Sequence, residues 1–551
     1  MTLAEPTLVA AFARAWRQPE WASRTAIVTA DTTLTYAELH QRVARIADGI
    51  RTAGVAPGSY VAIAMERSLE QVLTLLGVMA AGACPCPLEP RLSAEETARR
   101  VAAVGLTWLL HDKPNAATAA ASGLAPARVL EAASVASAAS VGSAADVASV
   151  ADVANMANMA GGATVADVAD PATVADLARP AHPARPDYAS ALGCADQILP
   201  DAPGLLLFTS GSTGNPKGVL LSHRGLANNA RGVLAHTGLT PDDRLLHVMP
   251  LHHTNALNNQ IFAPLLAGAS VALAGRFRAD DMPGLLRTFR PTIITGVPTM
   301  YARMLELEFD AASLAGLRFA RCGSAPITEA LHRRIEAFLG CPLVVSYGLS
   351  EATCTSTMNP PDARRVGSVG TVLAGQSVTL RLPDGAEAAP GGEGEICIAG
   401  DSLMLGYLGV DNGNDGAPAL LRTGDLGRFD DAGYLSITGR IKDVIIRGGE
   451  NISPALIEGV VTGLPFVAAC CVVGAPDDDL GEVPVIFAQP QADATAGAQE
   501  AAALQAEVQS RLGRIYVPRD VFWVERLPEN AVGKVDRKAL AGMVSRKPEH
   551  A

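Results

Sequence analysis

The chain reads Phe-Thr-Ser-Gly-Ser-Thr-Gly-Asn-Pro-Lys-Gly at residues 208–218, directly after the apolar run Leu205–Phe208. The apolar run predicts a buried strand, so the polar stretch is expected to form a loop at the end of that strand. Free backbone N–H groups, hydroxyls and a lysine are the groups that surround phosphates in proteins. A Walker A loop has Gly-Lys followed by Ser or Thr, whereas here Pro216 precedes Lys217 and Gly218 follows it. The stretch therefore predicts a polyphosphate-binding loop of another kind.

Four further motifs follow this loop along the chain. They are Tyr347-Gly-Leu-Ser-Glu351, Thr423-Gly-Asp425, Gly439-Arg-Ile-Lys-Asp443, and Pro528–Lys534 with Arg537. Together with the loop, they resemble in order and spacing the motifs of the adenylate-forming superfamily, which includes acyl-CoA synthetases, peptide-synthetase adenylation domains and beetle luciferases. The resemblance covers roughly residues 25–545, and Ser350 stands where the family has threonine.

The resemblance implies an α/β protein with two domains and a hinge. Residues 1–439 are expected to form a large N-terminal domain of layered sheets and helices with a small β-barrel subdomain. Residues 440–443 would be the hinge, and residues 444–551 a smaller, mobile α+β domain that carries the catalytic lysine. The length of 551 residues agrees, because it is too long for a single core.

The N-terminal part shows the pattern of alternating helices and strands. A helical pattern runs from Leu34 to about Ala53, a short strand is predicted at Ser59–Ala64, and an apolar helix at Leu69–Ala81 ends at Gly82. This alternation predicts α/β layers with a substantial parallel sheet.

Residues from about 115 to 192 break this pattern with an alanine-rich, low-complexity segment in which Ala-Asp-Val-Ala recurs. A small solenoid would need more large side chains for its core. We therefore expect an insertion, disordered or loosely helical, that lies outside the active site.

Composition excludes several classes of protein. The net charge of −12 disfavours a nucleic-acid-binding protein, whose binding face is normally basic. No run of about 18 apolar residues predicts a membrane span, and the N-terminus shows no secretory signal. Nine cysteines without paired metal-ligand spacing suit reduced thiols in a cytoplasmic protein.

The resemblance implies two half-reactions. A carboxylate attacks the α-phosphorus of ATP and releases pyrophosphate, and a thiol then attacks the acyl-adenylate. Lys534 is the implied catalytic cation, because an ammonium can bridge carboxylate and phosphate oxygens. Glu351 is assigned to Mg²⁺, because a carboxylate beside ATP phosphates needs a metal between them.

The nucleotide contacts follow from the same resemblance. Tyr347 is expected to stack on adenine, Asp425 to accept hydrogen bonds from the ribose, and Arg440 to contact ribose or phosphate. An isolated arginine such as Arg440 is more often structural. The complete set of expected ATP-binding residues is Thr209, Ser210, Gly211, Ser212, Thr213, Gly214, Lys217, Gly323, Ser324, Ala325, Pro326, Tyr347, Gly348, Ser350, Asp425 and Arg440.

The acyl pocket is expected around residues 249–256, which resemble the Pro-x-x-His motif of acyl-CoA synthetases. His253 is the matched histidine, and its expected role is to shape the pocket and the route to the adenylate. The segment lacks the aspartate with which amino-acid-activating relatives bind an ammonium group, so an α-amino acid is disfavoured. Gly348 leaves room for the reacting carboxylate.

Two polar features of this pocket each have two interpretations. Asn255 and Asn259 lie four residues apart, on one face if helical, and either bind polar groups of the substrate or cap neighbouring backbone. Arg321 either pairs with a second carboxylate of a diacid or is a surface or structural ion-pair arginine.

The segment Arg447–Pro454 resembles the Gly-Gly-Glu-Asn-Ile-x-Pro segment that forms the pantetheine tunnel of acyl-CoA synthetases. Gly448, Gly449 and Glu450 are therefore assigned to CoA, and Lys442 to the hinge pivot. Ser453 and Pro454 fit a helix N-cap and first helical residue.

We predict an ATP-dependent carboxylate–CoA ligase that uses a small-molecule carboxylic acid, which the sequence does not identify, together with ATP, Mg²⁺ and CoA. One alternative is an enzyme that loads an acyl group onto the phosphopantetheine of an external carrier protein. A nucleotide-binding scaffold without catalysis is a further alternative, which the presence of both Lys534 and Glu351 disfavours.

Overall fold

The computed structural model describes residues 7–90, 92–138, 197–209, 217–409, 418–492, 494, 496–529 and 535–545. The chain divides into two compact units. The first consists of Met1–Ala227, Pro250–His253 and Leu405–Gly416, and the second of Asn228–Met249, Thr254–Met404 and Ala417–Ala551. Among the helices of the described residues, none is both long and apolar enough to cross a membrane.

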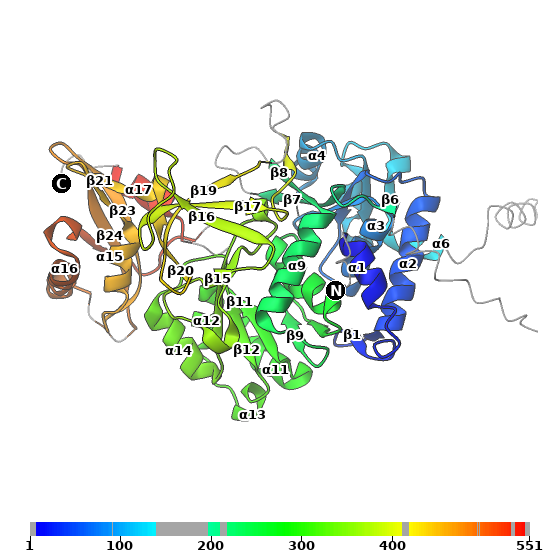
Figure 1. The fold of residues 1–551 in the computed structure, drawn as a ribbon, viewed down its shortest axis with the longest axis horizontal. Coiled ribbons are helices and arrows are strands. Elements are labelled where there is room, and N and C mark those ends of the chain that lie inside the picture. Colours follow the sequence, from blue (N-terminus) through cyan, green and yellow to red (C-terminus); the bar gives the residue numbers. More distant parts are fainter. Residues whose placement is uncertain are drawn as a thin grey trace, which may run out of the picture. The chain divides into compact units, whose positions relative to one another are not determined.

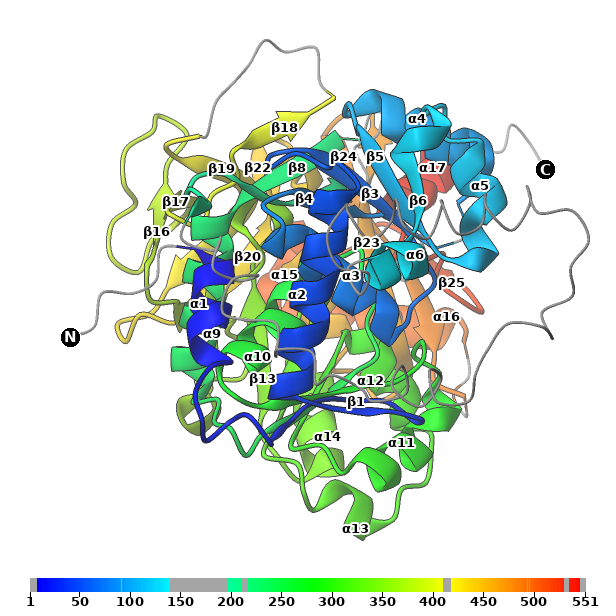
Figure 2. The same cartoon turned by 90° about the vertical axis from the view of Figure 1, so that its right-hand side faces the viewer.

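The first unit contains a parallel sheet with strand order β4-β3-β5-β6 and a smaller antiparallel sheet with order β18-β8-β7. Helices α2 and α3 pack against each other, and α4 and α5 form a second helical pair (Figure 2). The elements are α1 (Leu8–Ala15), β1 (Thr25–Val28), β2 (Thr33–Thr35), α2 (Tyr36–Thr52), β3 (Tyr60–Ala64), α3 (Leu69–Ala80), β4 (Cys84–Pro87), α4 (Ala94–Ala103), β5 (Trp108–His111), α5 (Ala116–Ala120), β6 (Val129–Glu131), α6 (Ala132–Ala138), β7 (Pro203–Thr209), β8 (Lys217–Ser222) and β18 (Gly406–Leu408).

The predicted alternation of helices and strands is confirmed in this unit, with shifted boundaries. Helix α2 begins at Tyr36 rather than Leu34, because Thr35 and Glu38 form a capping box that fixes the first turn. Helix α3 ends at Ala80, and Gly82 follows with a φ of +81°, a conformation that favours glycine.

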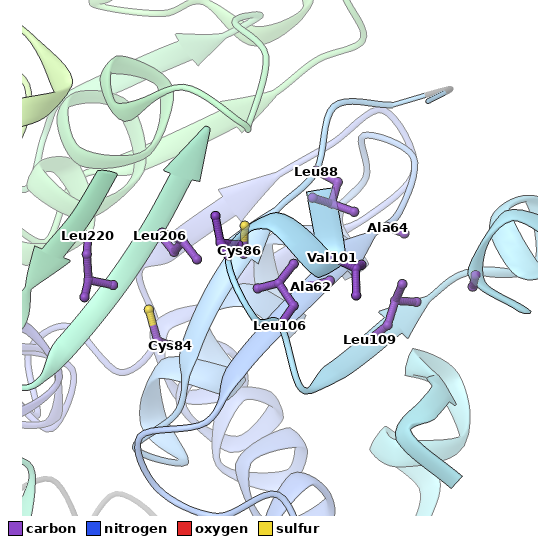
Figure 3. Packing of buried hydrophobic residues seen from close by; sticks show 12 residues of the cluster. Ala62, Ala64, Cys84, Cys86, Leu88, Val101, Leu106, Leu109, Leu206 and Leu220 are labelled. Atoms are coloured by element: carbon purple, nitrogen blue, oxygen red, sulfur yellow. The ribbon is translucent and has the colours of Figure 1, made fainter. Parts of the chain in front are cut away.

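The core of the first unit joins its two sheets. Ala62 of β3 and Cys86 of β4 belong to the same buried cluster as Leu206 of β7 and Leu220 of β8 (Figure 3). Small side chains on β3 and β4 leave room for the leucines of the antiparallel sheet. The strand that leads into the phosphate loop is thus anchored in a hydrophobic core.

The first part of the expected low-complexity segment is regular structure, so the prediction was wrong for residues 116–138. Strand β6 adds to the parallel sheet beside β5, with Val129 opposite Leu109. Helix α6 packs closely on α2, since a Cβ at Gly49 would lie 2.0 Å from the carbonyl oxygen of Val135. The residue that permits this close approach is Gly49 of α2, which lies outside the alanine-rich segment. Residues 139–192 lie outside the described residues.

The second unit contains the main sheet of the protein. Strands β10, β9, β11, β12 and β13 run parallel, and β14 and β15 extend the sheet antiparallel at the β13 side. Helices α11, α12 and α14 lie around this sheet (Figure 1). The elements are α9 (His223–Thr237, which enters the unit at Asn228), β9 (Arg244–His247), the π-helix η4 (Asn255–Phe262), α10 (Ala263–Leu266), β10 (Ser270–Leu273), α11 (Met282–Phe289), β11 (Ile293–Gly296), α12 (Pro298–Met304), α13 (Ala311–Leu314), β12 (Phe319–Cys322), α14 (Glu329–Leu339), β13 (Leu343–Tyr347), β14 (Thr357–Met358) and β15 (Thr371–Val372).

The region expected to form a small β-barrel consists of four antiparallel strands in the order β16-β17-β19-β20. They are β16 (Gln376–Arg381), β17 (Glu393–Gly400), β19 (Leu421–Phe429) and β20 (Leu435–Arg440). Their inward side chains, such as Ile396 and Leu435, share a core with Ala352, which follows the Tyr347–Glu351 motif. This core positions that motif next to the strands that carry Asp425 and Arg440.

The C-terminal part of the second unit is α+β, as predicted. Its sheet has the order β22-β21-β24-β23, with β25 parallel to β24. The elements are β21 (Ile445–Arg447), β22 (Glu450–Ile452), α15 (Pro454–Val461), β23 (Val467–Asp477), β24 (Gly481–Pro490), α16 (Ala498–Leu512), β25 (Val521–Trp523) and α17 (Arg537–Ser545).

The eight cysteines in the described residues are free thiols, as predicted. Seven are buried and Cys470 is half-buried. Burial raises the pKa of every one of these thiols above its ordinary value.

The ordered part of the alanine-rich segment gives the first prediction. Deleting residues 118–185 removes β6 and α6, and should lower the thermal unfolding midpoint by more than about 5 °C. Deleting only residues 141–190 spares both elements and should leave that midpoint and ATP-dependent pyrophosphate release unchanged. Equal unfolding midpoints for the two deletions would contradict a structural role for β6 and α6.

Candidate functional site

In the first unit, the phosphate loop joins two antiparallel strands. Thr209 ends β7 and pairs directly with Lys217, the first residue of β8. The Lys217 ammonium lies 5.6 Å from the centre of the Tyr407 ring on β18. The strand before the loop is confirmed, whereas the return strand at Lys217 was not predicted. Ser210, Gly211, Ser212, Thr213 and Gly214 lie outside the described residues.

Gly218 has a packing role that the sequence did not reveal. It lies within β8, and a Cβ there would come 2.8 Å from Leu206 and 3.0 Å from Val104. The sequence analysis placed Gly218 at the end of the expected phosphate-binding loop. The backbone of Gly218 has ordinary strand geometry. A larger side chain is excluded at this position because the surrounding core has no room for it.

The histidines of the predicted acyl segment do not form a metal site. His252 and His253 are half-buried neighbours in the first unit, with ring centroids 4.3 Å apart. In the second unit, His247 is fully buried, and its Nε2 lies 2.9 Å from the carbonyl oxygen of Ala256. Within the described parts of the chain, no group of three or more His, Cys, Asp or Glu side chains could hold a metal.

The centre of the candidate site in the second unit is the Asp425 carboxylate. The Tyr347 hydroxyl donates to its Oδ2 at 2.8 Å, and Arg440 Nε donates to its Oδ1. Asp425 is only 7% exposed, whereas the Arg440 side chain is half exposed. Burial, and then the Asp425 charge, raise the pKa of Tyr347, so the phenol keeps its proton. A carboxylate offers about four acceptor positions, so further donors fit beside these two.

A cleft of about 430 Å³ is lined in part by Arg440, the ion-pair partner of this carboxylate. Its walls include Thr423 and Gly424 together with the cations Arg422, Arg440 and Lys442. Arg422 is paired with the buried Glu395, whose other oxygen accepts from the backbone N–H of Gly424. The volume and the positive side chains suit an anionic ligand of nucleotide size.

The backbone around the Tyr347–Glu351 motif is strained and tightly packed. Thr353 and Cys354 have φ values of +62° and +131°, and Ser324 in the predicted adenine-side turn has a φ of +66°. Such conformations in residues with side chains concentrate at functional sites. A Cβ at Gly348 would lie 1.9 Å from the Cys354 carbonyl oxygen, so only glycine fits.

The other residues of the predicted adenine-side turn follow β12. Gly323 is buried, and a Cβ there would meet Ser346 Oγ at 3.0 Å. Ala325 is half-buried, while Ser324 and Pro326 are exposed. Because β12 and β13 are parallel neighbours, this turn lies at the same edge of the sheet as the Tyr347 motif.

Glu351 lies on a short 3-10 helix, Ser350–Ala352, and is half-buried. Its backbone carbonyl oxygen accepts from the N–H of Met404 at 2.8 Å, which fixes the helix. Ser350 Oγ lies 3.4 Å from Thr254 Oγ1 at the start of the π-helix η4. The assigned metal carboxylate thus sits on an anchored turn.

Arg321 is buried in the sheet, so the surface alternative for this residue was wrong. It is 3% exposed, and its Nη1 donates to the carbonyl oxygen of Asn259 at 3.1 Å. Asn255 and Asn259 share a helix face as predicted, with Asn259 Nδ2 lying 3.0 Å from Asn255 Oδ1. Asn259 Nδ2 also lies 2.8 Å from Thr355 Oγ1. These side-chain amides bond other side chains rather than capping backbone.

Gly448 and Gly449 form the turn of the hairpin β21–β22. Arg447 pairs with Glu450, and both glycines have positive φ values, +59° and +88°. Two central residues with positive φ define a tight hairpin turn of type I′, which strongly favours glycine. The fold alone therefore requires this pair of glycines, and the CoA assignment of Gly448, Gly449 and the exposed Glu450 stays a prediction.

The helix that follows this hairpin begins at Pro454, as predicted. Ser453 occupies the N-cap position, but its hydroxyl donates to the carbonyl oxygen of Thr438 on β20 instead of capping the helix. Lys442 lies on the exposed turn Ile441–Asp443 after β20.

Lys534 lies outside the described residues, but the residues on either side of its loop are described and are joined by backbone hydrogen bonds. Glu529 and Val535 form a bridge, and the N–H of Asp536 donates to the carbonyl oxygen of Pro528 at 2.7 Å. Arg537 then donates to Glu458 on α15 at 2.7 Å and to the Val472 carbonyl oxygen at 2.7 Å. Burial alone would lower the pKa of Arg537, and the Glu458 carboxylate outweighs it. Nothing in the sequence pointed to this ion pair.

Comparison with known proteins agrees with the motifs. The AMP-binding enzyme family matches residues 13–408, and the AMP-binding enzyme C-terminal domain family matches residues 456–534. A feruloyl-CoA synthase from an Amycolatopsis species is 34% identical over 537 residues, 95% of this chain and 96% of that protein. The sulfoacetate–CoA ligase of Cupriavidus necator is 38% identical over 346 residues, 62% of this chain and 67% of that protein. The structure of ATP-bound MatB from Rhodopseudomonas palustris has a TM-score of 0.78 at 27% identity, covering 98% of this chain and 99% of that one.

The fold and the order of the motifs are those of an ATP-using, adenylate-forming enzyme. The chain belongs to the AMP-binding enzyme family, among its CoA ligases.

The tight packing at Gly348 gives the second prediction. Gly348→Ala should displace the Cys354 carbonyl group, lower stability by about 1–3 kcal/mol and reduce ATP-dependent pyrophosphate release at least ~100-fold. The matched control is Gly284→Ala on α11, where a Cβ meets nothing within 4 Å. Wild-type activity in Gly348→Ala would show that the segment relaxes freely.

The ion pair at the base of the Lys534 loop gives the third prediction. Arg537→Met leaves Glu458 largely buried without its cation, which should cost up to about 3 kcal/mol in urea unfolding. The control Arg511→Met breaks an exposed pair with Glu507 on α16 and should cost under about 0.5 kcal/mol. Equal losses for the two variants would contradict the role given to Arg537.

Proposed function

We propose that the protein activates a carboxylic acid with ATP and transfers the acyl group to CoA. The observation that carries this proposal is the Asp425 carboxylate, which holds both Tyr347 and Arg440, and Arg440 lines a cleft of about 430 Å³. Family membership supports the use of ATP and CoA. The similar proteins are named for acids as different as ferulate and sulfoacetate, so their names do not single out one acid for this chain.

In the first half-reaction, a carboxylate oxygen of the acid forms a bond to the α-phosphorus of ATP. The bond from that phosphorus to the bridging oxygen breaks, and pyrophosphate leaves. Both reactants are anions, so the step requires fixed cations and oriented N–H groups. We assign this role to the Lys534 ammonium and to the phosphate loop, from Thr209 to Lys217.

The nucleoside end of ATP is assigned to the second unit. The Tyr347 ring offers a face for adenine, and the unused acceptor positions of Asp425 suit the ribose hydroxyls. Arg440 lies at the cleft and is half exposed, so it retains donors for ribose or phosphate. Ser350 and Gly348 would face the α-phosphate and the acyl carboxylate.

Mg²⁺ fits this site as an ion that arrives with the nucleotide. Mg²⁺ commonly binds one or two protein carboxylates together with substrate phosphates and water. A single half-buried carboxylate, Glu351, on an anchored turn matches that donor set, and the described residues contain no group of three or more His, Cys, Asp or Glu side chains that could hold a metal. The ion would neutralise charge on the phosphates, and Glu351 would hold it.

In the second half-reaction, the thiol sulfur of CoA forms a bond to the acyl carbon, the thiol proton is lost, and AMP leaves. We assign Gly448, Gly449 and Glu450 to the CoA chain, His253 to the wall of the acyl route and Lys442 to the hinge. The domains would be residues 1–439 and 444–551, joined at residues 440–443.

The fourth prediction separates the two half-reactions. Lys534→Ala should reduce adenylate formation at least ~1000-fold, measured as pyrophosphate release, and should change thiolation of a supplied acyl-adenylate less than about tenfold. Lys538→Ala, an exposed lysine on α17, is the matched control and should behave as wild type. Equal losses in both half-reactions would contradict the assigned role of Lys534.

The test of the whole proposal is pyrophosphate release from MgATP across a panel of carboxylic acids, with and without CoA. Formation of an acyl-CoA is the expected result. Adenylation that ignores CoA but responds to a phosphopantetheinylated carrier protein would favour the carrier-loading alternative. No acid-dependent release from any acid would overturn the proposal.

A further inference from the structure

Arg321 is a buried cation without a counter-ion among the described residues. It is 3% exposed, and its Nε has no hydrogen-bond partner there. Burial lowers the pKa of Arg321 to about 10, and the acids that oppose this effect are the weakly acidic groups of Cys354 and Tyr301. Isolated buried charges are rare in proteins because the charge loses its hydration.

The π-helix beside Arg321 holds further unpaired polar atoms. Asn258 Oδ1, Asn259 Oδ1 and both amide atoms of Gln260 lack partners in the described residues, and all three side chains are at most 1% exposed. Buried polar atoms are almost always hydrogen-bonded, so such a group needs a ligand or water. A π-helix is itself rare and frequent at functional sites.

A row of polar contacts leads from the proposed site of acyl activation to Arg321. Ser350 Oγ lies 3.4 Å from Thr254 Oγ1, and the neighbouring Asn255 is half-buried. Asn255 contacts Asn259 at 3.0 Å, and the Asn259 carbonyl oxygen accepts from Arg321 at 3.1 Å. We call these five residues the polar row. An acid whose carboxylate reacts beside Ser350 would direct its other end along this row.

We propose that the polar row is the acyl subsite, and that it selects a short acid with a second anionic group that pairs with the Arg321 guanidinium. This inference rests on the function proposed above, which places the reacting carboxylate near Gly348 and Ser350. A guanidinium binds a planar anion through two parallel hydrogen bonds, and the unpaired amide donor of Gln260 lies on the same helix as Asn259. A long aliphatic chain would leave Arg321 Nε and the Gln260 amide atoms without partners.

The test compares acids in pairs that differ only in the far group. The pairs are malonate with 3-oxobutanoate, succinate with 4-oxopentanoate, and sulfoacetate with methylsulfonylacetate. Acyl-CoA formation by the wild-type protein should favour the doubly charged member of at least one pair by ~100-fold or more in kcat/KM. The pair that responds distinguishes a carboxylate from a sulfonate as the second anion.

Arg321→Met should remove that preference, lowering kcat/KM for the doubly charged acid at least ~100-fold and for its neutral partner less than about tenfold. Arg334→Met, an exposed arginine on α14, is the matched control and should keep the wild-type preference. Equal losses for both acids of a pair would make Arg321 structural and overturn the inference.

If Arg321→Met does not fold, the inference is tested by the wild-type protein alone, through the ratio of kcat/KM values for the two acids of each pair. No preference for a second charge, with conversion of other acids to acyl-CoA, overturns the inference and leaves the proposed function intact. Failure of every acid, charged or neutral, to give acyl-CoA overturns the proposed function itself.

Discussion

The Asp425 carboxylate is the constraint on which the site of the second unit depends. It lies on β19 of the antiparallel sheet, yet it accepts from Tyr347 at the end of the parallel strand β13. It also holds Arg440, the last residue of β20. One buried charge thus fixes the end of the main sheet, the antiparallel strands and the first residue of the predicted hinge. Because the Asp425 carboxylate is buried, it needs the hydrogen bonds from Tyr347 and Arg440. The same bonds hold these two side chains in place.

The backbone near the Asp425 carboxylate is tightly packed and strained. The chain after Glu351 turns back so closely that Gly348 has no room for a side chain, and Thr353 and Cys354 adopt left-handed or nearby conformations. Strain of this kind persists only where the neighbouring structure holds it. The core of Ala352, Ile396 and Leu435 provides that support. Rigid packing rather than a mobile loop presents Ser350 and Glu351.

The sequence predicted the fold class and the parallel layers because periodic apolar patterns and capping residues act locally. The capping box of Thr35 and Glu38 spans only four residues, although the helix start was predicted at Leu34 rather than Tyr36. By contrast, the pairing of Arg537 with Glu458 joins positions 79 residues apart, and no local pattern marks it. Burial of Arg321 was missed for a related reason, since a charged residue normally indicates surface. The alanines of residues 116–138 were misjudged because small side chains also serve close helix packing.

The site residues also divide into those whose grouping followed from the sequence motifs and those whose structural role the sequence did not reveal. The family resemblance assigned Tyr347, Asp425 and Arg440 to one nucleotide, and in the structure hydrogen bonds join Tyr347 and Arg440 to Asp425. It did not show that Gly448 and Gly449 are needed for a hairpin turn, or that Gly218 is needed for core packing. A conformational requirement and a ligand requirement can select the same residue, and only coordinates separate them.

The buried thiols have a consequence for an enzyme that handles a free thiol as substrate. Thiol–disulfide exchange proceeds through the thiolate, and burial favours the protonated thiol in seven of the eight described cysteines, while Cys470 is half-buried and its pKa is also raised. The seven buried sulfurs are therefore poor partners for a mixed disulfide with oxidised CoA. The packing that stabilises the cores also protects the catalyst from covalent capture by the disulfide of its own acceptor.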